Sequence, residues 1–252
     1  LDAGVNVAGK PNENFAREVM ELHTMGHGTY TQEDVVAAAR SFSGWVMAPG
    51  GAERRRPPGS EPWTAAFIPN RHDNGDKTFL GVTGNHDLEA VIDILLDQPA
   101  TATTVAGKLF EELVGLRADD ATRERLGSIF RAEWKIMSVV EEIVADPAFT
   151  SDEAIRSRVR TPVERLVGVV QGIETTTEAP GLAAGILESS GYVPFLPPNP
   201  AGFAGGARLL GPYQLAHSLD ISGIVARPAP DYDVDQLFSR LGLFDVSATT
   251  RQ

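Results

Sequence analysis

The 252-residue sequence contains no cysteine. This absence excludes disulfide-stapled scaffolds, zinc–thiolate sites, iron–sulfur clusters and enzymes with a thiol nucleophile. It also has no run of 18 or more apolar residues, so no membrane-spanning helix is predicted. Positive charge is scarce, with 22 Lys and Arg against 34 Asp and Glu and a net charge of −12. We therefore expect no nucleic-acid partner, because polyanions attract positively charged surfaces.

Short motifs that carry a known mechanism are also absent. The sequence has no GxGxxG after a predicted strand, no Walker loop, no HExxH, no GxSxG and no EF-hand pattern. Hydrophobic residues make up 42% and charged residues 22%, which is the balance of a folded globular protein. The chain begins at Leu1 without the basic and apolar regions of a signal peptide, so we expect a mature or cut product.

Most of the sequence has the periodicity of amphipathic helices. Phe15, Val19 and Met25 recur at helical spacing and predict a helix over residues 13–25, with Asn12 as its N-cap. Further helices are predicted at 35–42, 88–96, 100–113, 121–130, 134–144 and 162–173, and weaker patterns at 181–187, 213–225 and 234–241. Their connections are short, which favours an antiparallel helical array. The predicted fold class is mainly α, with a small β-hairpin insertion.

Two regions interrupt the helical pattern. Residues 46–84 are predicted to form a loop and β-hairpin insertion, in which 63–68 pairs with 77–80 around an Asn-Gly turn. Residues 191–212 are predicted to be an extended segment rich in Pro and Gly. We expect residues 1–252 to form a single, mostly helical domain.

Charged residues crowd the first predicted helix. At about 100° per residue, Glu13, Arg17 and Glu21 share one face, and Glu18 is close enough to Glu21 to share a metal ion or a proton. His23 lies about 200° from Glu21, so one ion cannot be held by both from this helix alone. In the alternative interpretation, Arg17 bridges Glu13 and Glu21 as a structural ion-pair network, and His23 bonds to backbone at the helix end.

A metal site in this region needs ligands from elsewhere in the chain, and His72 and Asp73 are the most obvious ones. This yields one hypothesis, a metal-assisted enzyme with a divalent metal as its cofactor. The residues assigned to it are the metal ligands His72, Asp73 and His23, the acid–base groups Glu18 and Glu21, and the anion-stabilising cations Arg17 and Lys77. The alternative is a non-catalytic binding or scaffold protein, whose polar blocks specify the fold.

Several sequence blocks occur in an order that is similar to one known family. They include NENFAREVMELHT at 12–24, YTQEDV at 30–35, HDNGDKTFLG at 72–81, RTPVE at 160–164 and PPNPAGF at 197–203. Together they resemble the bacterial domain-of-unknown-function family 1800. The resemblance implies a mostly helical, exported protein, secreted or located in the periplasm or cell envelope. It also implies that the gene stands beside one for a hydrolase of the alkaline-phosphatase/sulfatase type.

The resemblance has further implications for the partners of this chain. The block at 12–24 usually lies well inside a longer protein, which implies that the present sequence is a C-terminal portion with a missing N-terminal segment as one partner. The companion sulfatase- or phosphatase-like hydrolase is the other expected partner. Three residues depart from the family pattern: His27 is not expected in its turn, and Phe203 and Arg208 stand at or near positions where tryptophan is usual.

Overall fold

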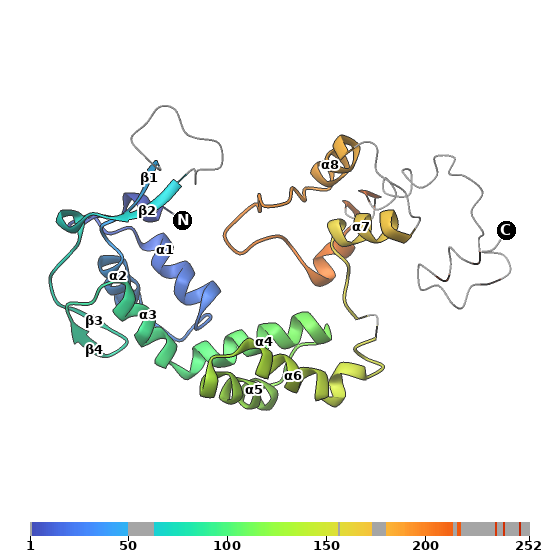
Figure 1. The fold of residues 1–252 in the computed structure, drawn as a ribbon, viewed down its shortest axis with the longest axis horizontal. Helices are drawn as coiled ribbons and strands as arrows, with labels where there is room; N and C mark the ends of the chain where they lie inside the picture. Colours follow the sequence, from blue (N-terminus) through green and yellow to red (C-terminus); the bar gives the residue numbers. More distant parts are fainter. Residues whose placement is uncertain are drawn as a thin grey trace. The chain divides into compact units, whose positions relative to one another are not determined.

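The computed structural model describes residues 2–49, 63–155, 157–172, 180–213, 216–217, 235, 239 and 247. The chain divides into two compact units, residues 1–155 and 156–252 (Figure 1). Eight α-helices and two two-stranded antiparallel sheets are found in the part that is described. The predicted fold class, mainly α with a small β-hairpin, is confirmed. Whether these two units form the single domain predicted for residues 1–252 is not tested, and this stays a prediction.

The first helix changes its geometry halfway along. Helix α1 (Glu13–Glu18) begins where the Asn12 side chain accepts a hydrogen bond from a backbone N–H, as predicted for an N-cap. It continues as a π-helical turn, η2 (Val19–His23), and the backbone N–H of Gly26 then donates to the carbonyl of Met20 at 3.0 Å. A π-turn holds more residues than an α-turn. A helical wheel drawn for an α-helix therefore misplaces the side chains of this turn.

Helix α2 (Gln32–Ser41) is fixed at its start by a capping box. The Thr31 hydroxyl accepts from the N–H of Asp34, and the Asp34 carboxylate accepts from the N–H of Thr31 at 2.8 Å. The other carboxylate oxygen of Asp34 accepts from the N–H of Leu80 at 2.7 Å. The same acidic residue thus caps the helix and attaches it to the turn of a β-hairpin.

The strand pairing differs from the prediction. Strand β2 (Trp63–Phe67) pairs with β1 (Trp45–Pro49), and β3 (Lys77–Phe79) pairs with β4 (Val82–Gly84), both antiparallel. The predicted pairing of 63–68 with 77–80 is therefore wrong. The hairpin turn is Leu80-Gly81, where both residues have positive φ, as a type I′ turn requires.

The remaining helices follow the predicted periodicity closely. Helices α3 (Leu88–Asp97), α4 (Pro99–Val114), α5 (Asp120–Glu133) and α6 (Ile136–Ala145) complete the first unit, and α7 (Pro162–Gly172) and α8 (Pro180–Ser189) lie in the second. The predicted helices at 213–225 and 234–241 fall largely outside the described residues. No helix in the described ranges is long and apolar enough to cross a membrane.

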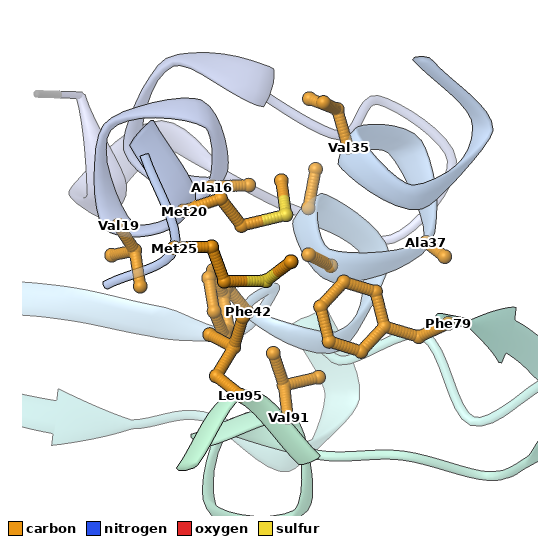
Figure 2. Close-up of a cluster of buried hydrophobic side chains, with 12 residues drawn as sticks. Ala16, Val19, Met20, Met25, Val35, Ala37, Phe42, Phe79, Val91 and Leu95 are labelled. Carbon is orange, nitrogen blue, oxygen red and sulfur yellow. The ribbon is translucent and has the colours of Figure 1, made fainter. Parts of the chain in front are cut away.

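The first buried cluster of the first unit is formed largely by residues of α1, η2 and α2. Met20, Met25 and Phe42 converge there, and Phe79 enters from β3 (Figure 2). A second buried cluster joins α4, α5 and α6. Because side chains alternate along a strand, Lys77 points to the same buried side as Phe79. This places a charged group beside an apolar core.

The second unit has a smaller core, in which Leu166 of α7 and Leu187 of α8 are buried. After α8 the chain runs through the Pro/Gly-rich segment, which ends in the short helical turn η5 (Gly206–Leu210).

Candidate functional site

Three charged residues, Arg40, Asp73 and Lys77, form a cluster where the end of α2 meets β3. Arg40 lies in the last turn of α2, Asp73 lies in the loop before the hairpin, and Lys77 is the first residue of β3. Lys77 reaches the other two residues because its side chain lies on the same buried face of β3 as Phe79. We take it as the candidate site, since it contains two of the residues that the sequence predicts to be functional.

Both oxygens of the Asp73 carboxylate accept hydrogen bonds from within the chain. The guanidinium of Arg40 donates to both of its oxygens, from Nε to Oδ2 at 2.7 Å and from Nη2 to Oδ1 at 3.1 Å. The backbone N–H of Gly75 donates to Oδ1 at 2.9 Å. The hydrogen bond from Arg40 is the main reason that the pKa of Asp73 falls to about 2. A carboxylate held in this way stays ionised and bound, and it is a poor general base.

The ammonium group of Lys77 has all three of its donors matched by acceptors. Nζ donates to the carbonyl oxygens of Asp73 at 2.5 Å and His86 at 2.8 Å, and to the side-chain oxygen of Asn85 at 3.1 Å. Only 2% of the residue is exposed. Burial lowers the pKa of Lys77, and the charge of Asp73 counteracts part of that effect. Lys77 thus ties the loop before β3 to the segment that follows β4.

His72 is turned toward the backbone at the end of α2. Its Nδ1–H donates to the carbonyl of Ser43 at 2.9 Å, and its ring meets the edge of Phe67 with centroids 5.5 Å apart. The close approach requires glycine at position 44. Its φ is +95°, and an added Cβ would lie 3.0 Å from Phe67 and 3.2 Å from His72.

Arg17 is paired within the first two helices. Its guanidinium donates to Glu13 at 3.2 Å and to the side-chain oxygen of Gln32 at 2.9 Å, and Gln32 also donates to Glu13 at 2.7 Å. This is the structural network that the alternative interpretation expects, except that Gln32 takes the place of Glu21.

Glu21 bonds instead to the turn that follows η2. It accepts a hydrogen bond from the Tyr30 hydroxyl at 3.1 Å and pairs with Nε2 of His27 at 3.0 Å. Burial raises the pKa of Tyr30, and its hydrogen bond to Glu21 raises it further. Glu18 is half-buried nearby, and His23 is exposed. Glu21 is therefore engaged with the turn at 26–30, whereas His72 and Asp73 contact the end of α2.

The predicted metal ligands are not brought together. Within the described ranges, no three His, Asp or Glu side chains gather closely enough to hold a metal ion. His72 and Asp73 face Ser43 and Arg40 at the end of α2, whereas Glu21 faces the turn at 26–30. The residues present do not fit a metal centre built from these two segments.

Sequence reasoning missed the residues that complete the network. Arg40 and Asn85 have no motif around them and become recognisable only through their distant partners. Asn6 is buried and links three segments: its Nδ2 donates to the carbonyl of Ala39 at 2.7 Å, and its Oδ1 accepts from the N–H of Asn12 at 2.9 Å. The only signal for Asn6 is its polarity in an otherwise apolar segment.

A shallow groove of about 270 Å³ runs along α2 beside the cluster. Its lining residues come from α2 and β3, and they are Gln32, Glu33, Val36, Ala37, Arg40 and Thr78. Both Arg40 and Gln32 are engaged with neighbouring side chains. The groove thus offers a surface for contact, and its main cation is already neutralised.

Comparison with known proteins gives one result. The family model described as "Protein of unknown function (DUF1800)" matches residues 1–252. No curated protein and no solved structure matches the chain. The match agrees with the sequence blocks that suggest this family, and it assigns no activity. The chain belongs to the DUF1800 family.

Proposed function

We propose that the protein acts by binding a partner and is not itself a catalyst. The observation that carries this proposal is that Lys77 and Asp73, two members of the charged cluster, are already matched by partners within the chain. Each N–H of the Lys77 ammonium and each oxygen of the Asp73 carboxylate already has a partner within the chain. Catalytic acids, bases and anion-binding cations need a donor or acceptor that faces the substrate. Lys77 and Asp73 lack this property, and the hydrogen bonds that join Arg40 to Asp73 and Asp73 to Lys77 are those of a network that specifies the fold.

The metal-assisted alternative is less well supported by the same contacts. Its two ligands from the loop, His72 and Asp73, are bound by Ser43 and Arg40. A metal ion would have to displace a bidentate Arg–carboxylate pair and a buried histidine hydrogen bond.

The partner and the location are part of the proposal and come from the family resemblance. We propose an exported protein of the cell envelope or the exterior that binds the companion alkaline-phosphatase/sulfatase-like hydrolase. The net charge of −12 supports a protein partner over nucleic acid. The shallow groove of about 270 Å³ beside α2 is one candidate surface for such contact.

Complex formation with the companion hydrolase tests this proposal. The full-length protein and the hydrolase encoded beside it are purified, mixed at tens of micromolar and followed by sedimentation velocity. We expect a faster-moving complex that persists when a chelator is added, because none of the contacts above depends on a metal ion. An unrelated acidic protein of similar size serves as the control. Independent sedimentation of the two proteins would contradict the proposal.

A further inference from the structure

An Asn-Gly pair lies in the loop before β3, outside the hairpin turn for which the sequence predicts it. The pair is Asn74-Gly75, whereas the hairpin turn is Leu80-Gly81. Asparagine followed by glycine is also the dipeptide most open to deamidation, because glycine has no Cβ to hinder the approach of its backbone nitrogen to the asparagine side chain. Asn74 is therefore a candidate site of covalent modification.

Deamidation makes asparagine a thermolabile residue, and it needs water but no enzyme. The backbone nitrogen of Gly75 would lose its proton to a base in the solvent and form a bond to Cγ of Asn74. The Cγ–Nδ2 bond would then break, and the side-chain nitrogen would leave as ammonia after taking a proton from water. Water would open the resulting succinimide ring at either carbonyl, which gives aspartate or isoaspartate. The reaction therefore requires that the N–H of Gly75 is free and that the Asn74 side chain turns toward it.

Both of these groups are held by hydrogen bonds that oppose the reaction. The N–H of Gly75 donates to Oδ1 of Asp73 at 2.9 Å, and a carboxylate acceptor stabilises the protonated form of its donor. Nδ2 of Asn74 donates to the carbonyl of His72 at 3.3 Å, which turns the amide toward the residues before it. Arg40 holds the Asp73 carboxylate with two hydrogen bonds. The carboxylate therefore cannot leave the N–H of Gly75 without breaking an ion pair.

We infer that Asn74 is a deamidation site that the Asp73 carboxylate, fixed by Arg40, keeps blocked in the folded chain. Isoaspartate at position 74 would lengthen the main chain by a carbon atom next to Asp73, and aspartate would add a negative charge there. Either product would disturb the loop in which the Asp73 carbonyl accepts from Lys77. The block thus preserves the contacts that tie this loop to the segment after β4. It needs no partner protein, and all of its contacts lie within residues 1–155.

Peptide mapping by mass spectrometry measures deamidation at Asn74 in the whole chain during incubation at mildly alkaline pH. The reference is a synthetic peptide with the sequence of residues 70–79, which lacks Arg40 and the folded loop. We expect Asn74 to deamidate at least about tenfold more slowly in the folded protein than in the peptide, because a hydrogen bond to a charged acceptor is worth a factor of that order. Equal rates in the protein and the peptide would overturn the inference.

The substitution Asp73→Ala removes the acceptor of the Gly75 N–H. We expect it to raise the deamidation rate about tenfold, relative to a peptide that carries the same substitution. The matched control is Gly127→Ala, which disturbs the same unit where α5 meets α4 and leaves Asp73 in place. We expect this control to deamidate at the wild-type rate. If Asp73→Ala stays as slow as the wild-type protein, or if Gly127→Ala accelerates equally, the carboxylate is not the block.

Hydrogen exchange at the Gly75 amide tests the same block without any variant, in case Asp73→Ala does not fold. Exchange in mildly alkaline solution removes the proton that deamidation must remove. We expect exchange at Gly75 in the wild-type protein to be at least about tenfold slower than in the peptide of residues 70–79. Exchange as fast as in the peptide would mean that the N–H is free, and this would overturn the inference.

Discussion

Replacing Lys77 by methionine is expected to lower the free energy of unfolding of the first unit by about 3 kcal/mol. Methionine has a similar length but no donor. The carbonyls of Asp73 and His86 and the amide oxygen of the exposed Asn85 would then each lose an N–H partner. An unpaired buried acceptor costs about 1–3 kcal/mol. The substitution also removes the cost of burying the lysine charge, but this gain offsets only part of the lost hydrogen-bond energy.

Urea unfolding followed by tryptophan fluorescence measures this effect directly. All three tryptophans of the chain, Trp45, Trp63 and Trp134, belong to residues 1–155, so the signal reports the first unit. Lys10→Met is the control, since Lys10 is exposed in the same unit, and we expect its effect to stay below about 0.5 kcal/mol. A Lys77→Met variant as stable as this control would show that the ammonium group is not a structural tie.

The second large effect is expected at Gly127, where α5 approaches α4. A Cβ added there would lie 2.7 Å from Cγ2, 2.8 Å from Cα and 2.9 Å from the backbone N of Thr103. Because two of these atoms belong to the backbone, the helices must move apart. We expect Gly127→Ala to destabilise the first unit by about 2 kcal/mol, even though alanine gains up to about 1 kcal/mol in helix propensity.

A glycine on the opposite helix of the same pair provides the matched control. A Cβ at Gly107 would meet only the side chain of Arg123, at 3.3 Å and beyond, and that side chain can move. We expect Gly107→Ala to change the stability by less than about 0.5 kcal/mol, or to increase it. Tryptophan-monitored urea unfolding measures both variants. Equal stability of Gly127→Ala and the wild-type protein would mean that α4 and α5 are not in such close contact.

Local features of the fold could be predicted from the sequence because their causes are local. Asn12 caps α1 and Thr31 caps α2, and each bonds to a backbone N–H within three residues. The amphipathic stripes likewise locate α3 to α6. The strand pairing could not be predicted in the same way, because β1 lies in a Gly/Pro-rich stretch and its partner strand β2 is some 20 residues away.

The candidate site was less predictable because its contacts are distant in sequence. Arg40 and Asp73 are 33 residues apart, and no periodicity or motif connects them. The role of Lys77 depends on the alternation in β3, whose pairing partner was assigned incorrectly. Glu21 bonds to Tyr30 and His27 in the turn that follows the π-helical residues, contacts that a helical wheel cannot predict. The prediction identified residues of unusual chemistry, and the long-range contacts determined what each of them does.

If the charged cluster of Arg40, Asp73 and Lys77 holds the fold together, Asp73→Asn should weaken the fold. The folded-state pKa of Asp73 is about 2, below its ordinary value of 3.8. Its ionised form therefore stabilises the fold above about pH 4, and this contribution disappears as the pH falls toward 2. Because 20% of its side chain is exposed to solvent, we reduce the expected contribution of the ionised carboxylate to the free energy of unfolding to about 1.5 kcal/mol.

The measurement is the free energy of unfolding of the wild-type protein and Asp73→Asn, from tryptophan-monitored urea unfolding between pH 7 and pH 2.5. We expect a less stable variant at pH 7 and a difference in the free energy of unfolding that narrows as the pH falls from about 4 to 2.5. A variant that is equally or more stable at pH 7 would contradict it, because a gain in stability on removal is typical of a residue that is kept for function at the expense of the fold.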